Sequence, residues 1–244
     1  MKALILAAGL GTRLRPLTEK TPKQLLPVNG KPPLLYHLES LSLFGVDGVL
    51  INTHHLSEKI DSFVKGEQTV FPSMTITTTF EPELLGSAGT MFANKTFFDD
   101  SEDFLVVYGD NLTDINYKEF FDEHKKKGGL VTIACYYEHH PESKGIINFN
   151  DSGKITSFLE KPKKEQVTSN WANAGMYFIN KKIFEYINNF EQTPLDFGYH
   201  LFPFLLEKGE DMYIYQMSET VLDIGTLESY NEAQSLAKKL FKND

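Results

Sequence analysis

The sequence predicts an α/β fold in which a mixed, mostly parallel sheet lies between helices and forms a single domain. Short apolar runs typical of buried strands alternate with stretches of helical periodicity through the first half of the chain. The chain has 244 residues, 41% of them hydrophobic and 23% charged, which suits a globular protein with a sizeable core. A glycine-containing loop directly follows the first apolar run, as it does at the ligand-binding edge of many α/β sheets.

The first half of the chain alternates strand and helix in the order expected for a parallel sheet. The helix expected over residues 34–44 has apolar residues at helical spacing and ends before Gly45, a typical helix stop. Glycines at 86 and 89 indicate a loop over residues 81–89. We expect strands at 2–7, 48–52, 74–80, 103–108 and 130–137, and helices at 34–44, 56–65 and 116–126.

The second half is more mixed, and we expect its strands to extend the same sheet. Asp223 is expected at the end of a further short strand, before Ile-Gly-Thr. We expect strands at 145–148, 155–159, 173–179 and 212–216, and helices at 181–188, 196–207 and 227–241.

Composition and charge exclude some classes of protein and favour others. The net charge is −9, yet residues 1–31 hold six basic residues and one acidic residue. An acidic protein with one basic segment is a poor candidate for binding nucleic acid and a reasonable one for holding a small polyanion. The single cysteine, Cys135, excludes an internal disulfide and a cysteine metal cluster, and it fits a cytoplasmic protein. No apolar run approaches the length of a membrane span.

The loop after the first strand carries the strongest functional signal. Small residues at Ala7, Ala8 and Gly9 allow backbone N–H groups to approach phosphate oxygens closely. Arg13 can bind a phosphate with two parallel hydrogen bonds, and Lys23 adds a compact positive charge. The loop is neither a P-loop nor a dinucleotide fingerprint, because it lacks Gly-Lys-Ser/Thr and has a different glycine spacing.

The pattern GxGTRLxPLTxxxPKxLLPV in this segment resembles the signature of the sugar-phosphate nucleotidyltransferases. That family includes glucose-1-phosphate thymidylyltransferases and mannose-1-phosphate guanylyltransferases. The resemblance continues to about residue 235, through Leu85-Gly86-Ser87-Ala88-Gly89, Tyr108-Gly109-Asp110, Lys144-Gly145, Glu160-Lys161-Pro162, Asn173-Ala174-Gly175 and Asp223-Ile224-Gly225-Thr226.

The resemblance implies a Rossmann-like nucleotide-diphospho-sugar transferase fold and one catalytic domain over residues 1–240. Its nucleotide-binding half would cover about 1–130 and its sugar-binding half about 131–240, with a lid on the sugar side. A left-handed β-helix domain, which some relatives carry, is not expected, because no hexapeptide repeats are present. The resemblance also leads us to expect a homodimer.

The implied reaction joins a nucleoside triphosphate to a sugar 1-phosphate and releases pyrophosphate. The resemblance assigns catalytic roles to Arg13, Lys23 and Asp110, and Mg²⁺ ligation to Asp110 and Asp223, in keeping with that ion's preference for oxygen ligands. The nucleotide is expected to contact Leu6, Ala7, Ala8, Gly9, Gly11, Thr12, Arg13, Lys23, Glu83, Gly86 and Ser87. Its base is expected to rest against Ala7, Ala8 and Gly9, with the loop 81–89 contacting the edge of the base. The sugar phosphate is expected to contact Gly145, Glu160, Lys161 and Asn173.

Base and sugar are less clearly indicated. Leu85-Gly86-Ser87-Ala88-Gly89 resembles the loop of mannose-1-phosphate guanylyltransferases and favours GTP with mannose- or heptose-1-phosphate. Ala8 stands where the family more commonly has glycine, and the resulting Leu-Ala-Ala-Gly resembles the loop of uridylyl- and cytidylyltransferases. Gln24 is expected to contact the base or to shape the loop, and the run Lys-Gln-Leu-Leu-Pro that contains it resembles that of thymidylyltransferases.

Three other functions are alternatives to this reaction. A metal-dependent glycosyltransferase would usually show Asp-x-Asp after the central strand, where this chain has Gly109-Asp110-Asn111. A non-catalytic subunit that binds nucleotide sugars is disfavoured by the intact Arg13, Lys23 and Asp110. Cytidylyl transfer to a small non-sugar phosphate is disfavoured because Glu-Lys-Pro and Asn-Ala-Gly occur together.

Overall fold

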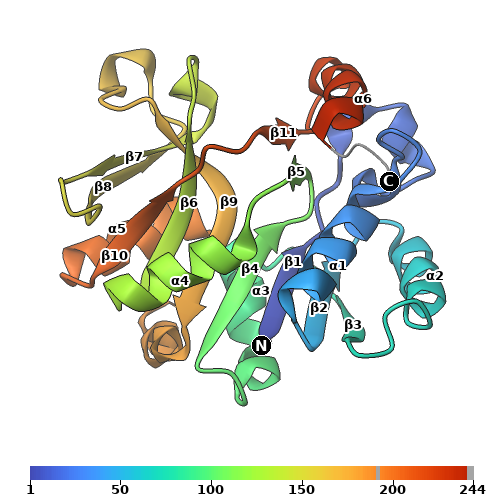
Figure 1. Ribbon diagram of the computed structural model, residues 1–244, viewed down its shortest axis with the longest axis horizontal. Helices are drawn as coiled ribbons and strands as arrows, with labels where there is room; N and C mark the ends of the chain where they lie inside the picture. The colour runs from blue at the N-terminus through green and yellow to red at the C-terminus, as the bar shows by residue number, and fades with distance from the viewer. Residues whose placement is uncertain (191–192, 241–244) are drawn as a thin grey trace. The chain divides into compact units, whose positions relative to one another are not determined.

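A computed structural model describes residues 1–190 and 193–240 (Figure 1). The chain folds into two compact units. The first unit comprises Met1–Leu84, Val107–Ile115 and the segment from Glu219 onward. The second comprises Leu85–Val106 and Asn116–Ser218. The units are therefore interleaved along the chain.

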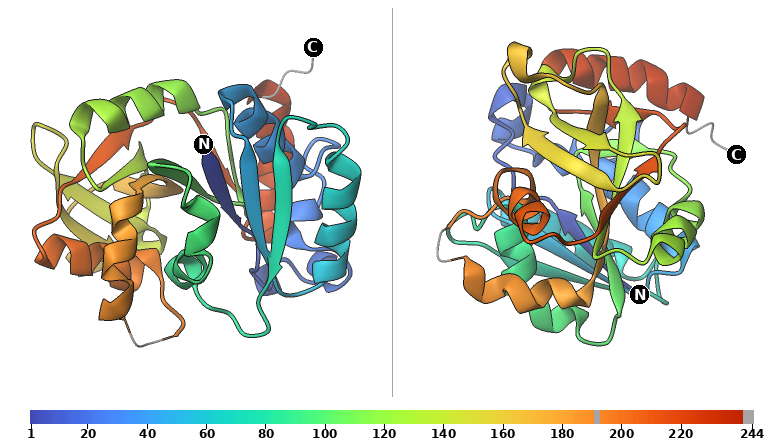
Figure 2. Two further views of the ribbon diagram at one scale, coloured as in Figure 1. Left: turned by 90° about the horizontal axis from the view of Figure 1, so that it is seen from below. Right: turned by 90° about the vertical axis from the view of Figure 1, so that its left-hand side faces the viewer.

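Three parallel strands form the sheet of the first unit: β1 (Lys2–Leu6), β2 (Gly48–Thr53) and β3 (Thr75–Phe80). β2 lies between the other two, with Leu6 opposite Asn52 and Thr53 opposite Phe80. Every residue of β2 is buried, which explains its continuous apolar run. The three strands lie side by side in the left view of Figure 2. Their bounds match the predicted strands to within one residue.

Helices α1 (Pro33–Phe44) and α2 (Ser57–Glu67) connect these three strands. α1 begins with proline in its first turn and ends at Gly45, whose φ of 90° is left-handed. The predicted helix stop at Gly45 is thus confirmed.

A short antiparallel ribbon completes the first unit. It pairs β5 (Asn111–Thr113) with β11 (Val221–Asp223), and α6 (Leu227–Leu240) follows it. A separate apolar cluster packs these elements together; its buried residues are Val28, Tyr36, Leu112, Leu222, Ile224, Ala233 and Ala237. The sequence indicated β11 but not β5, which is only three residues long. Residue 241, the predicted end of α6, lies outside the described residues.

The sheet of the second unit is mixed. β6 (Val131–Tyr137) runs parallel to β10 (Met212–Gln216) and antiparallel to β9 (Trp171–Asn180). A hairpin of β7 (Gly145–Phe149) and β8 (Ile155–Glu160) joins it through β7 and β9. β4 (Asp103–Tyr108) begins in the second unit, and its last two residues belong to the first.

Helices of the second unit pack on this sheet. α4 (Tyr117–Lys127) lies against β6 and β10 (Figure 1), with the Asn116 side chain accepting hydrogen bonds at its start and Gly128 ending it. α5 (Phe202–Glu207) contacts β8. Sheets packed against helices in both units confirm the predicted α/β class.

Three helical segments differ from the prediction. α3 (Ser87–Ala93) starts inside the expected loop 81–89, and its length of seven residues is too short to show a clear periodicity. The segment Lys181–Asn189 is a 3₁₀ helix. The segment expected as one helix over 196–207 begins with a π-helical turn, Phe197–Leu201, before α5.

Two remaining features of the fold concern the single cysteine and the length of the described helices. Cys135 lies buried in β6, and burial raises the pKa of its thiol far above the usual value, which disfavours a reactive thiolate. Among the described helices, none is long and apolar enough to cross a membrane.

Candidate functional site

The loop that follows β1 over residues 7–23, called the phosphate loop after its predicted role, leaves this buried strand and turns sharply at Gly11. Gly11 has a φ of 62°, and a Cβ there would lie 2.8 Å from the Thr18 side chain. Thr18 closes the turn by donating its hydroxyl proton to the Gly11 carbonyl at 2.7 Å. Gly9, Thr12 and Arg13 are left exposed at the loop, where they can contact an anion.

The β5–β11 ribbon brings Asp223 close to Asp110. In its register Asp223 lies opposite Asn111, and the Ile224 N–H donates to the Asp110 carbonyl at 3.2 Å. This pairing brings Asp110 and Asp223 to neighbouring positions, which the sequence could suggest only through the family resemblance.

Lys23 and Arg13 place positive charge beside these two aspartates. Lys23 Nζ forms an ion pair with Asp110, and the lysine is buried. Gly225 separates Asp223 from Arg13: a Cβ at Gly225 would lie 2.8 Å from Asp223 Oδ1 and 3.1 Å from Arg13 Nη2. We call Arg13, Lys23, Asp110 and Asp223 the charge cluster.

The two carboxylates of the charge cluster suit Mg²⁺, which typically takes one or two protein carboxylates together with substrate phosphates. The described residues contain no group of three or more histidine, cysteine or acidic side chains that could hold a metal. The donor set therefore fits an ion shared with a phosphate ligand better than a fully protein-bound one.

Two buried polar side chains, Gln24 and His37, lie near the Gly109–Asp110 turn. The sequence indicated a role for Gln24 but not for His37. Gln24 Oε1 and His37 Nε2 have no hydrogen-bond partner among the described residues. Burial lowers the pKa of His37 to about 4, although Asp110 opposes the shift, so the imidazole is neutral at pH 7. Gln24 Cγ would lie 3.3 Å from a Cβ at Gly109, which is consistent with a role in shaping the loop.

Residues predicted to contact the base fall in both units, and each is described within its own. Glu83, in the first unit, is exposed. In the second unit, Gly86 has a φ of 81° and lies so close to the Leu195 backbone that a Cβ would clash with it. Ser87 donates its hydroxyl proton to Asp196 Oδ2 at 2.7 Å and accepts from the Phe197 N–H at 3.0 Å. The hydroxyl of Ser87 is therefore engaged within the protein.

Glu160 is the centre of the predicted sugar site in the second unit. It ends β8 opposite Gly145, and a Cβ at Gly145 would lie 2.6 Å from Glu160 Oε2. A Cβ at Gly198 would crowd the same oxygen even more closely. Burial raises the pKa of Glu160; the Asp196 charge adds to this effect, and Lys161 and Lys144 oppose it.

Lys161 and Asn173 differ in how freely they can reach a ligand. Lys161 has a φ of 46°, and its Nζ lies 3.9 Å from Glu160 Oε1 and 5.9 Å from the centre of the Tyr199 ring. Its side chain is 58% exposed, which leaves the ammonium open to a phosphate. Asn173 is more occupied, because its amide donates to the Tyr177 hydroxyl at 2.8 Å and accepts from the Gly175 N–H at 2.9 Å.

Asp196 is a residue of this region that sequence reasoning missed. Its Oδ1 accepts from the N–H groups of Gly198 and Tyr199, and its Oδ2 accepts from Ser87. It therefore holds Gly198 beside Glu160 and also fixes the start of α3. An aspartate before a predicted helix indicates an N-cap, but not a link to a segment more than a hundred residues away.

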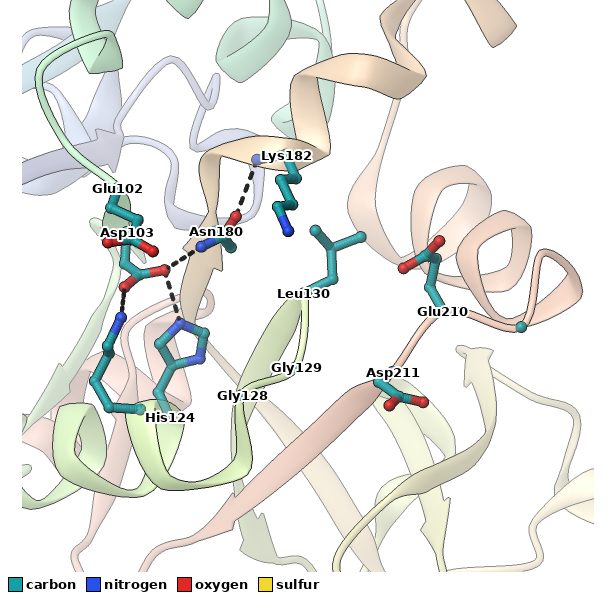
Figure 3. A pocket seen from close by; sticks show the side chains of 12 residues that line it. Glu102, Asp103, His124, Gly128, Gly129, Leu130, Asn180, Lys182, Glu210 and Asp211 are labelled. Carbon is teal, nitrogen blue, oxygen red and sulfur yellow. Dashed lines mark hydrogen bonds and ion pairs between the residues drawn. The ribbon is translucent and has the colours of Figure 1, made fainter.

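A pocket of about 510 Å³ lies elsewhere in the second unit, at the amino ends of β4, β6 and β10 (Figure 3). Its buried Asp103 accepts hydrogen bonds from Lys125 at 2.7 Å and Asn180 at 2.8 Å, and lies 3.4 Å from His124 Nε2. None of the predicted site residues lines this pocket. Ligands of α/β sheets bind at the opposite, carboxyl ends of the strands, so Asp103 is best explained as a structural group.

Comparison with known proteins agrees with the resemblance. The profile of the nucleotidyl transferase family matches residues 2–239. A UTP–glucose-1-phosphate uridylyltransferase of Synechocystis sp. is 34% identical, over 96% of this chain and 62% of the relative. The catalytic subunit beta of a mannose-1-phosphate guanylyltransferase from Danio rerio is 33% identical, over 92% of this chain and 61% of the relative. The chain thus spans about three fifths of the length of these relatives.

A solved structure extends the comparison to the fold. A UDP-glucose pyrophosphorylase complexed with UDP-glucose superposes with a TM-score of 0.84, covering 98% of each chain at 22% sequence identity. The predicted mixed, mostly parallel sheet flanked by helices is confirmed by this match.

Proposed function

Because the chain belongs to the nucleotidyl transferase family, we propose that it joins a nucleoside triphosphate to a sugar 1-phosphate and releases pyrophosphate. The observation that carries the proposal is the charge cluster, in which Arg13, Lys23, Asp110 and Asp223 come together from distant parts of the chain. Two polyanions must meet in this reaction, and a site with both cations and metal-binding carboxylates serves that purpose.

The proposed chemistry is an in-line displacement at the α-phosphorus. An oxygen of the sugar phosphate forms a bond to this phosphorus while the bond to the bridging oxygen of pyrophosphate breaks. A phosphate oxygen is already a nucleophile, so positioning and charge neutralisation account for the catalysis without a general base. In the proposal Arg13 and Lys23 neutralise charge on the α-phosphate and the departing pyrophosphate.

Asp110 and Asp223 are the residues that would hold Mg²⁺. When bound, the ion would neutralise phosphate charge and help to align both substrates. Lys23 already offsets the charge of Asp110 in the protein itself. The charge cluster is thus balanced before substrates arrive.

The sugar phosphate is assigned to Glu160 and Lys161 in the second unit. Gly145 and Gly198 have no side chain, so the Glu160 carboxylate lies directly against their backbones. In the proposal this carboxylate, whose side chain is 16% exposed, accepts hydrogen bonds from sugar hydroxyls. The exposed Lys161 ammonium would bind the phosphate of the sugar.

For the substrates themselves we favour GTP with mannose- or heptose-1-phosphate. The Leu-Gly-Ser-Ala-Gly loop supports this choice, and so does the similarity to a mannose-1-phosphate guanylyltransferase. The second candidate is UTP with glucose 1-phosphate, supported by Ala8 and by the similarity to the Synechocystis uridylyltransferase.

Pyrophosphate release in the presence of Mg²⁺ tests the proposal. GTP, UTP, CTP, dTTP and ATP are each combined with a panel of sugar 1-phosphates. We expect release that requires both substrates and is fastest with GTP and mannose- or heptose-1-phosphate. Fastest release with UTP and glucose 1-phosphate would favour the second candidate. Silence across the panel from folded protein that still binds nucleotide would contradict the proposed reaction and favour a non-catalytic binding subunit.

A further inference from the structure

The peptide group between Leu6 and Ala7 is held at both of its polar atoms. This peptide is where β1 ends and the phosphate loop begins. The Leu6 carbonyl accepts a hydrogen bond from the Gly109 N–H at 3.0 Å. The Ala7 N–H donates to Asn52 Oδ1 at 2.6 Å, in a buried contact. The exit of β1 is therefore fixed on one side by the turn that carries Asp110 and on the other by the Asn52 side chain.

Asn52 uses the other end of its amide to bind Glu81. Its Nδ2 donates to Glu81 Oε1 at 2.9 Å, and both side chains are almost fully buried. Glu81 is also fixed through its backbone, because its N–H donates to the Thr53 carbonyl and its own carbonyl accepts from His54 Nδ1 at 2.7 Å. Glu81 is the first residue of the segment 81–89 that is expected to contact the base.

We propose that Asn52 is a positioning residue for the nucleotide, because its amide ties the exit of the phosphate loop to the start of the base-contacting segment. This inference rests on the proposed function. The Ala7 N–H is already donated to Asn52, so this group does not bind phosphate itself. Its role is to set the direction in which Ala8 and Gly9 leave the sheet.

The chemistry of the amide explains why asparagine occupies this position. One end must accept from a backbone N–H, and the other must donate to a carboxylate. Aspartate could still accept from Ala7, but it has no donor for Glu81 and would bury two carboxylates side by side. In the pair Asn52→Asp with Glu81→Gln, the amide changes sides, and a hydrogen bond can form again with donor and acceptor exchanged.

The test compares four proteins: wild type, Asn52→Asp, the double variant Asn52→Asp/Glu81→Gln, and Gln68→Ala as a matched control. Gln68 supports a turn of the first unit through side-chain hydrogen bonds to Phe71, Met74 and Ile76, away from the phosphate loop. Nucleotide affinity is measured by calorimetry with GTP and UTP, and KM for each substrate is measured by pyrophosphate release. Thermal unfolding of each variant reports its stability.

We expect Asn52→Asp to weaken nucleotide binding about tenfold and to raise KM for the triphosphate by a similar factor, with KM for the sugar phosphate nearly unchanged. The double variant should recover most of the loss. Gln68→Ala should lower thermal stability and leave both KM values unchanged. Unchanged nucleotide affinity in Asn52→Asp, or equal changes in both KM values, would overturn the inference.

The calorimetric readout separates this inference from the proposed reaction. Wild-type protein that binds nucleotide but releases no pyrophosphate would contradict the reaction, while weaker binding by Asn52→Asp would still support the positioning role. Wild-type protein that binds neither GTP nor UTP would contradict both.

Discussion

Two carboxylates, Asp110 in the first unit and Glu160 in the second, lie in opposite electrostatic environments. Asp110 in the first unit pairs with the Lys23 ammonium, and Asp223 lies beside it. Glu160 in the second unit is half-buried beside two glycines, and its pKa is raised by desolvation and by the Asp196 charge. In the proposed function, the first region would handle phosphate and metal charge, and the second would accept hydrogen bonds from an uncharged part of the sugar.

Removing the exposed arginine of the charge cluster should have the largest effect. We expect Arg13→Ala to lower kcat by about a hundred- to a thousandfold, because the charge on the α-phosphate and pyrophosphate loses its guanidinium partner. Pyrophosphate release measures the loss, and circular dichroism checks the fold. Arg15→Ala, an exposed arginine in the same loop, is the control and should keep near-normal turnover. Near-normal turnover in Arg13→Ala would remove this residue from the mechanism.

Weakening the proposed metal-binding pair, Asp110 and Asp223, should give the next largest effect. We expect chelation to abolish turnover and Mg²⁺ to restore it. In Asp223→Asn the Mg²⁺ concentration for half-maximal rate should rise at least about tenfold, because the site loses one charged ligand. Asp114→Asn removes an exposed aspartate of the same unit and should leave this concentration unchanged. An identical Mg²⁺ requirement in the wild type and Asp223→Asn would exclude Asp223 as a ligand.

The smallest effect on turnover is expected at Asp103, which lines a pocket that contains none of the predicted site residues. Burial opposes its ionisation, but hydrogen bonds from His124, Lys125 and Asn180 outweigh this and hold the pKa of Asp103 well below its usual range. Because the folded pKa lies below the unfolded one, the stabilisation is complete above about pH 4 and is lost as the pH falls further. Asp103→Asn should cost about 1–3 kcal/mol of unfolding free energy at pH 7 and less at pH 3.

Urea unfolding at several pH values measures this difference, and pyrophosphate release should show kcat and both KM values close to wild type. A stability difference that stays constant from pH 7 to pH 3 would show that the Asp103 charge does not contribute. A large loss of turnover in the folded variant would show that the pocket beside Asp103 takes part in the reaction.

Sequence patterns predicted most of the strands, because buried runs and glycine stops depend on local chemistry. The β5–β11 pairing that brings Asp223 to Asp110 depends on a contact between distant segments, and no local pattern encodes it. For the same reason Asn52 and Asp196 were missed: their side chains bind groups that only the fold places beside them. The motif residues themselves were identified by resemblance, and their contacts with substrates stay a prediction.

In the proposed function, Glu160 binds the sugar phosphate while the charge cluster binds the triphosphate. Steady-state kinetics on Glu160→Gln and Gly198→Ala test this assignment most directly. A Cβ at Gly198 would crowd Glu160 Oε2, so both variants disturb the same carboxylate. Gly66→Ala, a helical glycine whose Cβ would meet nothing within 4 Å, is the control. We expect KM for the sugar phosphate to rise about tenfold in both variants, with KM for the triphosphate unchanged. An unchanged KM for the sugar phosphate, or an equal rise for the triphosphate, would contradict the assignment of Glu160 to the sugar.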